Sequence, residues 1–340
     1  VDALCREIRS ISQKEVYEVV SIFIGGGTPS VLSGEQLCRI MDEIKQAFIL
    51  SEDAEITMEA NPGTVSPEQL KLCHEAGINR ISFGLQSTVQ QELDMLGRIH
   101  TYEEFLQSYH WARKAGFSNI NVDLMFAIPG QTCENWKHNL ETIAELSPEH
   151  ISAYSLIIEE GTPFAQKKLI LPTEDEEYQM YEDTAEILRK YGFHQYEISN
   201  YARDGFECRH NKGYWQRTEY LGAGLGAASL FQGKRFSNTR DMQTYLADST
   251  EPEKIREDVT ALSRNNEIEE FMFLGLRMTE GISERQFERN FGCRIEDIYG
   301  SVLAKYKEMD LLEHTGEFWR FTRKGIHVSN PVLADFLLDE

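Results

Sequence analysis

Polar residues stand where predicted β-strands end, and an arginine opens a loop close to them in sequence. Glu59 in MEANPG, Gln86 in GLQS and Asp123 in NVDLMFAIPG end successive predicted strands, and Arg98 follows in LGRIH. Such oxygens accept hydrogen bonds from ribose hydroxyls and from an ammonium group, and a guanidinium pairs with a carboxylate. Because no Ser/His/Asp or Cys/His set accompanies them, hydrolysis is poorly supported. The pattern indicates a site for a polar nucleoside with an amino-acid tail.

The stretch IFIGGGTPS runs an apolar strand directly into Gly25, Gly26 and Gly27. A tight turn from strand to helix needs one glycine, so three in a row favour a ligand that approaches the main chain closely. The loop is not a Walker loop, because no Gly-Lys-Ser/Thr follows it. Its amides and Thr28 can hold a carboxylate or an amino-acid group instead.

Short apolar segments and amphipathic helices alternate over the first part of the chain. Capping-box sequences at Ser33, Ser66 and Thr101 predict helix starts, and glycines at 77 and 116 predict helix ends. This alternation predicts a parallel sheet with crossover helices, and polar residues at the strand ends favour a β/α barrel. With five or six strands the barrel would be incomplete. We expect strands at 19–24, 55–60, 80–85, 120–127 and 151–158.

From about residue 265 the pattern changes to helices followed by a hairpin. Helices are predicted at 266–278, 283–290 and 295–309, and a two-strand ribbon turning at Thr315-Gly316 follows them. This order resembles a winged-helix module, but its third helix carries few basic residues, which favours a structural or partner-docking role over DNA binding. We expect a partial barrel over 1–205, a barrel extension over 206–264 and the winged-helix-like domain over 265–340.

The composition excludes several classes of protein. The 340 residues carry a formal net charge of −22, with the basic residues scattered, so nucleic-acid binding is disfavoured. No apolar run is long enough to span a membrane, and the first residues do not form a secretory signal. The 6 cysteines include no C-x2-C or C-x3-C pair, so no metal motif is visible. We expect a cytoplasmic protein.

In order along the chain, the segments GGGTP, MEANP, GLQS, LGR and VDLMFAIPGQT resemble the radical S-adenosylmethionine (SAM) proteins. More closely, they resemble the group that contains oxygen-independent coproporphyrinogen III oxidase and the heme chaperone HemW. The resemblance implies that the glycine-rich loop faces the methionine part of SAM and that the strand-end residues contact the rest. Ile157 stands where the oxidases contact SAM through the backbone. The implied SAM residues are Gly26, Gly27, Thr28, Glu59, Gln86, Arg98, Asp123 and Ile157.

One feature of that group is missing from the sequence. Its members carry a C-x3-C-x2-C loop that binds a [4Fe–4S] cluster, a few dozen residues before the GGGTP segment. The opening helix, with Ala3, Leu4 and Ile8, resembles the helix that follows this loop. We therefore expect the cluster cysteines upstream of Val1 in a longer protein, and the alternative is a family member that lacks the cluster.

The segment CRHNKGYW decides between the branches of the group. By itself, His210 is more often a structural histidine than a heme ligand, but the H-N-x-x-Y-W pattern resembles the heme chaperones. The resemblance implies that His210 binds heme beside Tyr214 and Trp215 and that the protein delivers heme to acceptor proteins, including membrane heme proteins approached from the surface. Two alternatives remain: anaerobic oxidation of coproporphyrinogen III, and a SAM-responsive interaction protein without catalysis. The glycines of YLGAGLGAAS favour close backbone packing over a nucleotide loop.

Overall fold

The computed structural model describes residues 1–12, 18–161 and 164–338. The chain forms two compact units. The terminal unit comprises Val1–Glu18, Glu43–Leu50 and Arg209–Glu340, and the sheet unit comprises Val19–Asp42 and Ser51–Cys208. The predicted division at residues 205 and 264 stays a prediction, and the last two residues of its third part lie outside the described residues.

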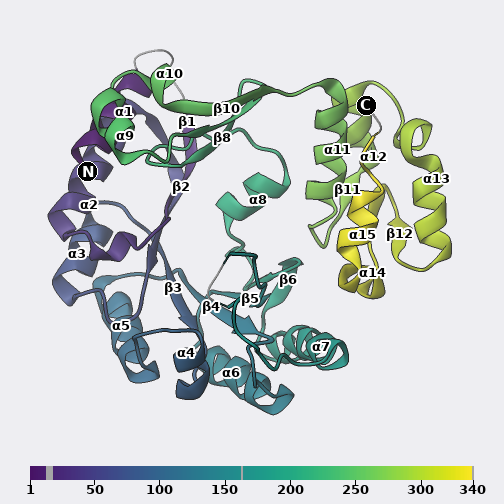
Figure 1. Cartoon of the computed structure of the whole chain (residues 1–340), viewed down its shortest axis with the longest axis horizontal. Helices are drawn as coiled ribbons and strands as arrows, with labels where there is room; N and C mark the ends of the chain where they lie inside the picture. The colour runs from purple at the N-terminus through teal and green to yellow at the C-terminus, as the bar shows by residue number, and fades with distance from the viewer. Residues whose placement is uncertain (13–17, 162–163, 339–340) are drawn as a thin grey trace. The chain divides into compact units, whose positions relative to one another are not determined.

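A curled seven-stranded sheet is the centre of the sheet unit. Its strands lie in the order β1-β2-β3-β4-β5-β7-β6, and the pairs from β2 to β5 are parallel. Helices α3, α4, α5 and α6 lie along the outer side of this sheet (Figure 1). The predicted incomplete β/α barrel is therefore confirmed. The strands are β1 (Glu18–Ile24), β2 (Ile49–Ala60), β3 (Arg80–Gln86), β4 (Ile120–Phe126), β5 (His150–Ser155), β6 (His194–Glu197) and β7 (Asn200–Ala202).

The helices between these strands begin and end where the sequence indicates. Ser66 and Thr101 form capping boxes at the starts of α3 and α5, and Gly116 closes α5 with a left-handed φ of 107°. Ser33 and Gln36 exchange the same pair of capping hydrogen bonds before α2. The elements are the 3-10 helix η1 (Pro29–Val31) and the helices α2 (Gly34–Ala47), α3 (Pro67–Glu75), α4 (Gln90–Met95), α5 (Tyr102–Ala115), α6 (Cys133–Glu145) and α7 (Glu174–Lys190).

Three details of the predicted sheet are wrong. Strand β2 begins at Ile49, six residues before the predicted start, and Asp123 lies in the middle of β4 instead of at its end. The sheet is also not wholly parallel, because β7 pairs antiparallel with both β5 and β6. The short edge segments HQYE and NYA carry no crossover helix between them, so a pattern of alternating strands and helices does not reveal them.

The terminal unit contains the first helix and an antiparallel sheet, β10-β9-β8. Glu7 of α1 is buried and accepts hydrogen bonds from the Gly224 amide at 2.9 Å, Asn238 Nδ2 at 2.6 Å and the Tyr245 hydroxyl at 2.6 Å. A single carboxylate thus joins α1 to three later segments. The elements are α1 (Asp2–Ser12), α8 (Arg209–Trp215), β8 (Ala228–Phe231), β9 (Lys234–Asn238), α9 (Met242–Asp248), α10 (Pro252–Ile255) and β10 (Arg256–Ala261).

The same unit ends in a helical module with its own core. The predicted helices and hairpin are confirmed, with the turn at Gly316-Glu317, one residue later than expected. A third strand, β11, and two short final helices were not predicted; β11 joins β13 at the edge of the hairpin. The elements are α11 (Arg264–Gly275), β11 (Ile282–Ser283), α12 (Glu284–Phe291), α13 (Ile295–Glu308), β12 (Leu312–Thr315), β13 (Phe318–Phe321), α14 (Arg323–His327) and α15 (Ser329–Ala334).

No helix in the described part of the chain is both long enough and apolar enough to cross a lipid bilayer.

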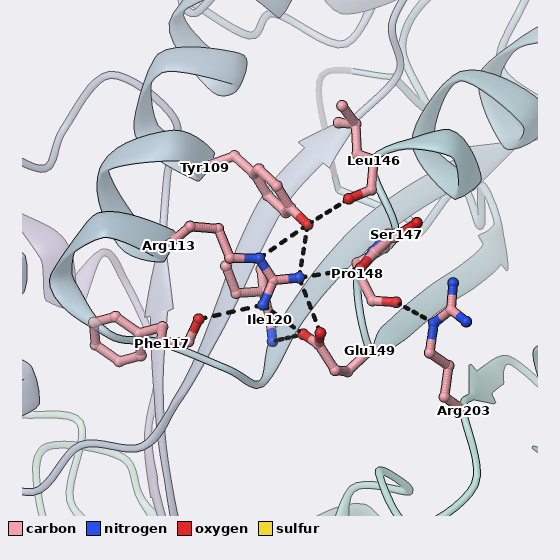
Figure 2. A network of polar contacts seen from close by, with 9 residues as sticks. All are labelled: Tyr109, Arg113, Phe117, Ile120, Leu146, Ser147, Pro148, Glu149 and Arg203. Atoms are coloured by element: carbon pink, nitrogen blue, oxygen red, sulfur yellow. Dashed lines mark hydrogen bonds and ion pairs between the residues drawn. The ribbon is translucent and has the colours of Figure 1, made fainter.

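A network around Arg113 joins α5 to the segment that enters β5 (Figure 2). Its guanidinium forms a bidentate pair with Glu149 at 2.8 and 3.0 Å and also donates to the Tyr109 hydroxyl and to the carbonyls of Phe117 and Ser147. Glu149 accepts from the Ile120 amide as well, at the first residue of β4. One ion pair therefore fixes the start of two neighbouring strands relative to a helix.

We predict that Arg113→Met lowers the free energy of unfolding by about 3 kcal/mol, because it leaves a partly buried carboxylate without its cation. Chemical denaturation monitored by circular dichroism measures this. Lys190→Met is the matched control, because it removes an exposed i,i+4 pair with Glu186 and should cost under about 0.5 kcal/mol. Equal losses in the two variants would contradict the structural role of the Arg113 network.

Candidate functional site

The three glycines after β1 serve two different structural needs. Gly26 and Gly27 have left-handed φ angles of 86° and 63°, and nothing lies within 4 Å of where a Cβ would stand. At Gly25, in contrast, a Cβ would lie 2.7 Å from the Phe23 ring and 3.0 Å from Glu59 Oε2. The glycine run therefore combines one close packing contact with two turn positions that face open space, which is consistent with the expected approach of a ligand.

This loop is joined to the end of β2. The Gly26 amide donates to Glu59 Oε2 at 3.1 Å, and Asn61 Nδ2 donates to the Thr28 hydroxyl at 3.4 Å. A second contact joins the residues that follow: the hydroxyls of Ser30 and Thr64 lie 2.6 Å apart. The structure thus brings together the GGGTP and MEANP segments, which are distant in sequence.

A row of polar side chains crosses the inner face of the sheet at one level. The register pairs Glu59 with Ser82, Ser82 with Asn121, and Asn121 with His150, so these side chains share a face. Asn121 Nδ2 donates to the Ser82 hydroxyl at 2.7 Å, and His150 Nδ1 lies 2.6 Å from Asn121 Oδ1. Residues of the other parity are apolar and face the helices, as in the edge-to-face contact of Phe83 with Phe105 of α5.

Asp123 stands two residues beyond this row on the same face. Asn121 Nδ2 donates to its Oδ1 at 2.7 Å and the Ser82 hydroxyl to its Oδ2 at 3.5 Å. Burial raises the pKa of Asp123 above its ordinary value, against these hydrogen bonds. Burial also raises the pKa of Glu59, and the charge of Asp123 adds to that effect. Two carboxylates therefore share one poorly solvated region, where a cationic ligand would be stabilised.

Gln86 and Tyr154 form the next part of the site. Gln86 ends β3 with an unusual positive φ of 77°, at the point where the register between β3 and β4 shifts. The Tyr154 hydroxyl donates to Gln86 Oε1 at 2.7 Å. Burial raises the pKa of Tyr154, and the nearby charges of Asp123, Arg98 and Glu59 also act on it. Tyr154 thus lies among the predicted residues, although it was not predicted itself.

Arg98 follows helix α4, whose position is held by a buried glutamate, Glu92. Glu92 Oε2 accepts hydrogen bonds from the Ser87 hydroxyl at 2.6 Å, Gln131 Nε2 at 2.9 Å and Asn139 Nδ2 at 3.1 Å. Ser87 and Gln131 belong to the quoted segments GLQS and IPGQT. These residues therefore hold α4, which leads directly to the half-buried Arg98.

Ile157 belongs to the sheet unit but takes no part in the contacts described above, and His210 belongs to the terminal unit. Ile157 follows the end of β5 with 79% of its surface exposed, so its role as a backbone contact stays a prediction. His210 belongs to α8 in the terminal unit, where its Nε2 lies 3.0 Å from the Tyr214 hydroxyl. Tyr214 in turn packs edge-on against Tyr220, with ring centroids 4.7 Å apart. His210, Tyr214 and Tyr220 thus form an aromatic group within that unit.

The glycine-rich segment after α8 is a packing feature. A Cβ on Gly222 would lie 2.3 Å from the Ala228 carbonyl oxygen, which is closer than atoms can approach. The expected close backbone packing is confirmed there. Within the described ranges, none of the 6 cysteines forms a disulfide, and no group of three or more His, Cys, Asp or Glu side chains is placed to hold a metal ion.

The chain matches known proteins along its length. Residues 1–143 match the radical SAM superfamily, and residues 262–328 match the HemN C-terminal domain. The heme chaperone HemW of Lactococcus lactis is 39% identical over 344 residues, covering 100% of this chain and 89% of that protein. HemW of Bacillus subtilis is also 39% identical, covering 97% and 88%.

Among solved structures, coproporphyrinogen III oxidase (HemN) from Escherichia coli, a radical SAM enzyme, has a similar fold. The TM-score is 0.86 at 23% sequence identity, covering 99% of this chain and 82% of that one. This similarity concerns the fold alone, whereas the two bacterial relatives show which family the sequence belongs to.

We predict different costs for alanine at neighbouring glycines of the loop. Gly27→Ala should lower the free energy of unfolding by about 1 kcal/mol, the cost of a side chain in the left-handed region. Gly25→Ala should cost about 2 kcal/mol, because its methyl group overlaps the Phe23 ring and the Glu59 carboxylate. Urea denaturation compares them, and a larger loss for Gly27→Ala would show that the loop is built differently.

Proposed function

Because the chain belongs to the HemW heme chaperone family of the radical SAM superfamily, we propose that it binds SAM and heme and transfers heme to acceptor proteins. The observation that carries the SAM part is the convergence of the Gly26 amide and the Glu59 and Asp123 carboxylates on the inner face of the sheet. The H-N-x-x-Y-W sequence on α8 carries the heme part. We propose that it does this work in the cytoplasm.

In this proposal, different residues of the site contact the ammonium, carboxylate and nucleoside parts of SAM. The open turn at Gly26, Gly27 and Thr28 faces the methionine part, and the adjacent Glu59 accepts from its ammonium group. Arg98 pairs with the SAM carboxylate. Gln86 and Asp123 accept from the nucleoside, and Ile157 adds a backbone contact. The superfamily also implies a [4Fe–4S] cluster, for which the described residues provide no group of ligands.

The heme part requires a change at His210. Its Nε2 lies at hydrogen-bond distance from the Tyr214 hydroxyl, so that contact must open before the same nitrogen can bind iron. Tyr214 and Trp215 lie on the same short helix and can form an aromatic wall beside the porphyrin. A bound heme brings the iron, while the chain supplies one imidazole and the walls that orient it.

The main alternative is the porphyrinogen oxidation performed by the E. coli enzyme of similar fold. That likeness is limited to the fold at 23% identity, whereas two HemW relatives are 39% identical over 97–100% of this chain. The oxidase hypothesis requires SAM-dependent oxidative decarboxylation of porphyrinogen propionates, which releases CO2 and leaves vinyl groups. A heme chaperone requires uptake and release of unaltered heme, so analysis of the porphyrin after incubation distinguishes the two.

We predict that His210→Ala weakens heme binding at least tenfold and shifts the Soret band of the bound form, because an iron ligand is removed. Titration of heme followed by absorption spectroscopy measures both. His138→Ala, at an exposed position of α6, is the control and should bind heme like the parent chain. An unchanged titration for His210→Ala would remove this histidine from the site.

We also predict a pH-dependent role for Glu59 in SAM binding. Its raised pKa means that it takes up a proton at a higher pH than an ordinary carboxyl group, so its attraction for the ammonium is lost as the pH falls. At pH about 7.5, Glu59→Gln should bind SAM about tenfold more weakly than the parent chain, and this ratio should decrease as the pH is lowered. Calorimetric titrations measure this ratio, in which the titration of SAM itself cancels. A ratio independent of pH would contradict the assignment.

A further inference from the structure

Arg277 and Trp215 form a stacked pair in the terminal unit. Arg277 follows α11, and the carbon at the centre of its guanidinium lies 4.4 Å from the centroid of the Trp215 ring. Arg277 Nε and Trp215 Nε1 are both buried, and neither has a hydrogen-bond partner in the described chain. Trp215 is the last residue of the H-N-x-x-Y-W sequence, so this pair lies at the end of the helix that carries His210.

A buried donor without an acceptor is unfavourable, and here two occur on side chains in contact. Leaving such a group unpaired in the interior lowers stability, because its hydrogen bond to water is lost and not replaced. A guanidinium on an aromatic face still offers its planar edge, which fits the two oxygens of a carboxylate. The pair therefore presents donors that suit a carboxylate.

Arg277 lines a pocket in which the one carboxylate is already paired with another arginine. The pocket contains the apolar side chains of Leu276, Met278, Phe321 and Ile326, together with Thr279 and Glu313. Arg320 lines the same pocket, but its Nε is paired with Glu313 Oε1 at 2.7 Å. Among the described carboxylates, none forms an ion pair with Arg277. The pocket thus combines an apolar wall with a cation that is available to an anionic ligand.

Glu270 holds α11 against the segment that follows α8. Its carboxylate is nearly buried and pairs with Arg217 Nε at 3.0 Å and Arg235 Nε at 2.6 Å. Breaking such a pair is costly, so the separation of α8 and α11 is well defined. The contact of Arg277 with Trp215 is therefore part of a fixed arrangement and not a chance meeting of long side chains.

We propose that Arg277 binds a propionate carboxylate of the heme, with Trp215 stacked beneath the guanidinium. This inference rests on the proposed heme function, because heme is an apolar disc that carries two carboxylates. The chain has a formal net charge of −22, so a dianionic ligand needs a local cation. Arg277 supplies that cation next to the predicted heme helix, and the apolar pocket wall suits the porphyrin edge.

Heme and heme dimethyl ester, in which both propionates are methylated, provide the test on the full chain. The parent chain should bind heme about tenfold more tightly than the ester, since the ester cannot form the charged pair. Arg277→Met should weaken heme binding about tenfold and leave ester binding within about twofold, and Arg277→Lys should recover part of the loss. Arg289→Met, which removes one positive charge at an exposed position of α12 in the same unit, is the control and should leave the preference for heme unchanged.

Other outcomes separate this inference from the proposed function. Equal affinity of the parent chain for heme and ester, or equal weakening of both ligands by Arg277→Met, would overturn the propionate assignment while the heme function stands. Weaker binding of an acceptor protein with unchanged heme affinity would also overturn it and would assign the pocket to an acidic partner. A parent chain that binds neither porphyrin would instead reject the proposed function itself. The comparison of the two ligands in the parent chain needs no variant to fold.

Discussion

A row of hydrogen-bonded polar side chains across a parallel sheet is the constraint on which the sheet unit depends. Burying these groups is tolerable because each finds a partner at the same register level, from Ser82 through Asn121 to His150 and the Tyr196 hydroxyl. A slip of one residue between β3 and β4 would point the polar side chains of one strand towards the helices. It would also bring apolar side chains to the inner face of the sheet. The register is therefore fixed by polar satisfaction on one face and by apolar packing on the other.

That row also determines the electrostatics of the site above it. Asn121 holds Asp123 in place, while burial works against the charge of both Asp123 and Glu59. Water competes weakly for such carboxylates, so a ligand that brings positive charge gains more there than it would at an exposed surface. The same burial that makes the site costly to build makes it selective for a cation.

The sequence predicted the parts of this arrangement that follow a local rule. Alternating strands and helices, capping boxes and the glycine loop all act within a few residues, and the structure confirms them. Tyr154 was missed because its significance depends on Gln86, 68 residues earlier, although the alternation of His150, Ser152 and Tyr154 in HISAYS was a visible signal. Strands β6 and β7 were missed because antiparallel edges need no crossover helix. Arg277 carries no motif, and its isolation from carboxylates emerges only from the folded arrangement.

The two proposed sites differ in the sign of the charge that they offer to their ligands. SAM carries a sulfonium and an ammonium, and its proposed site places two poorly solvated carboxylates on one sheet face. Heme carries two carboxylates, and its proposed site offers a guanidinium that no described carboxylate neutralises, whereas the neighbouring Arg320 is paired. Within the described residues, Arg277 combines a buried Nε that has no hydrogen-bond partner with an aromatic ring beneath its guanidinium. Glu270 pairs with Arg217 and Arg235 and so holds α11 beside the segment after α8, while stacking on Trp215 orients Arg277. A cation that is already oriented loses less conformational entropy when an anionic ligand binds.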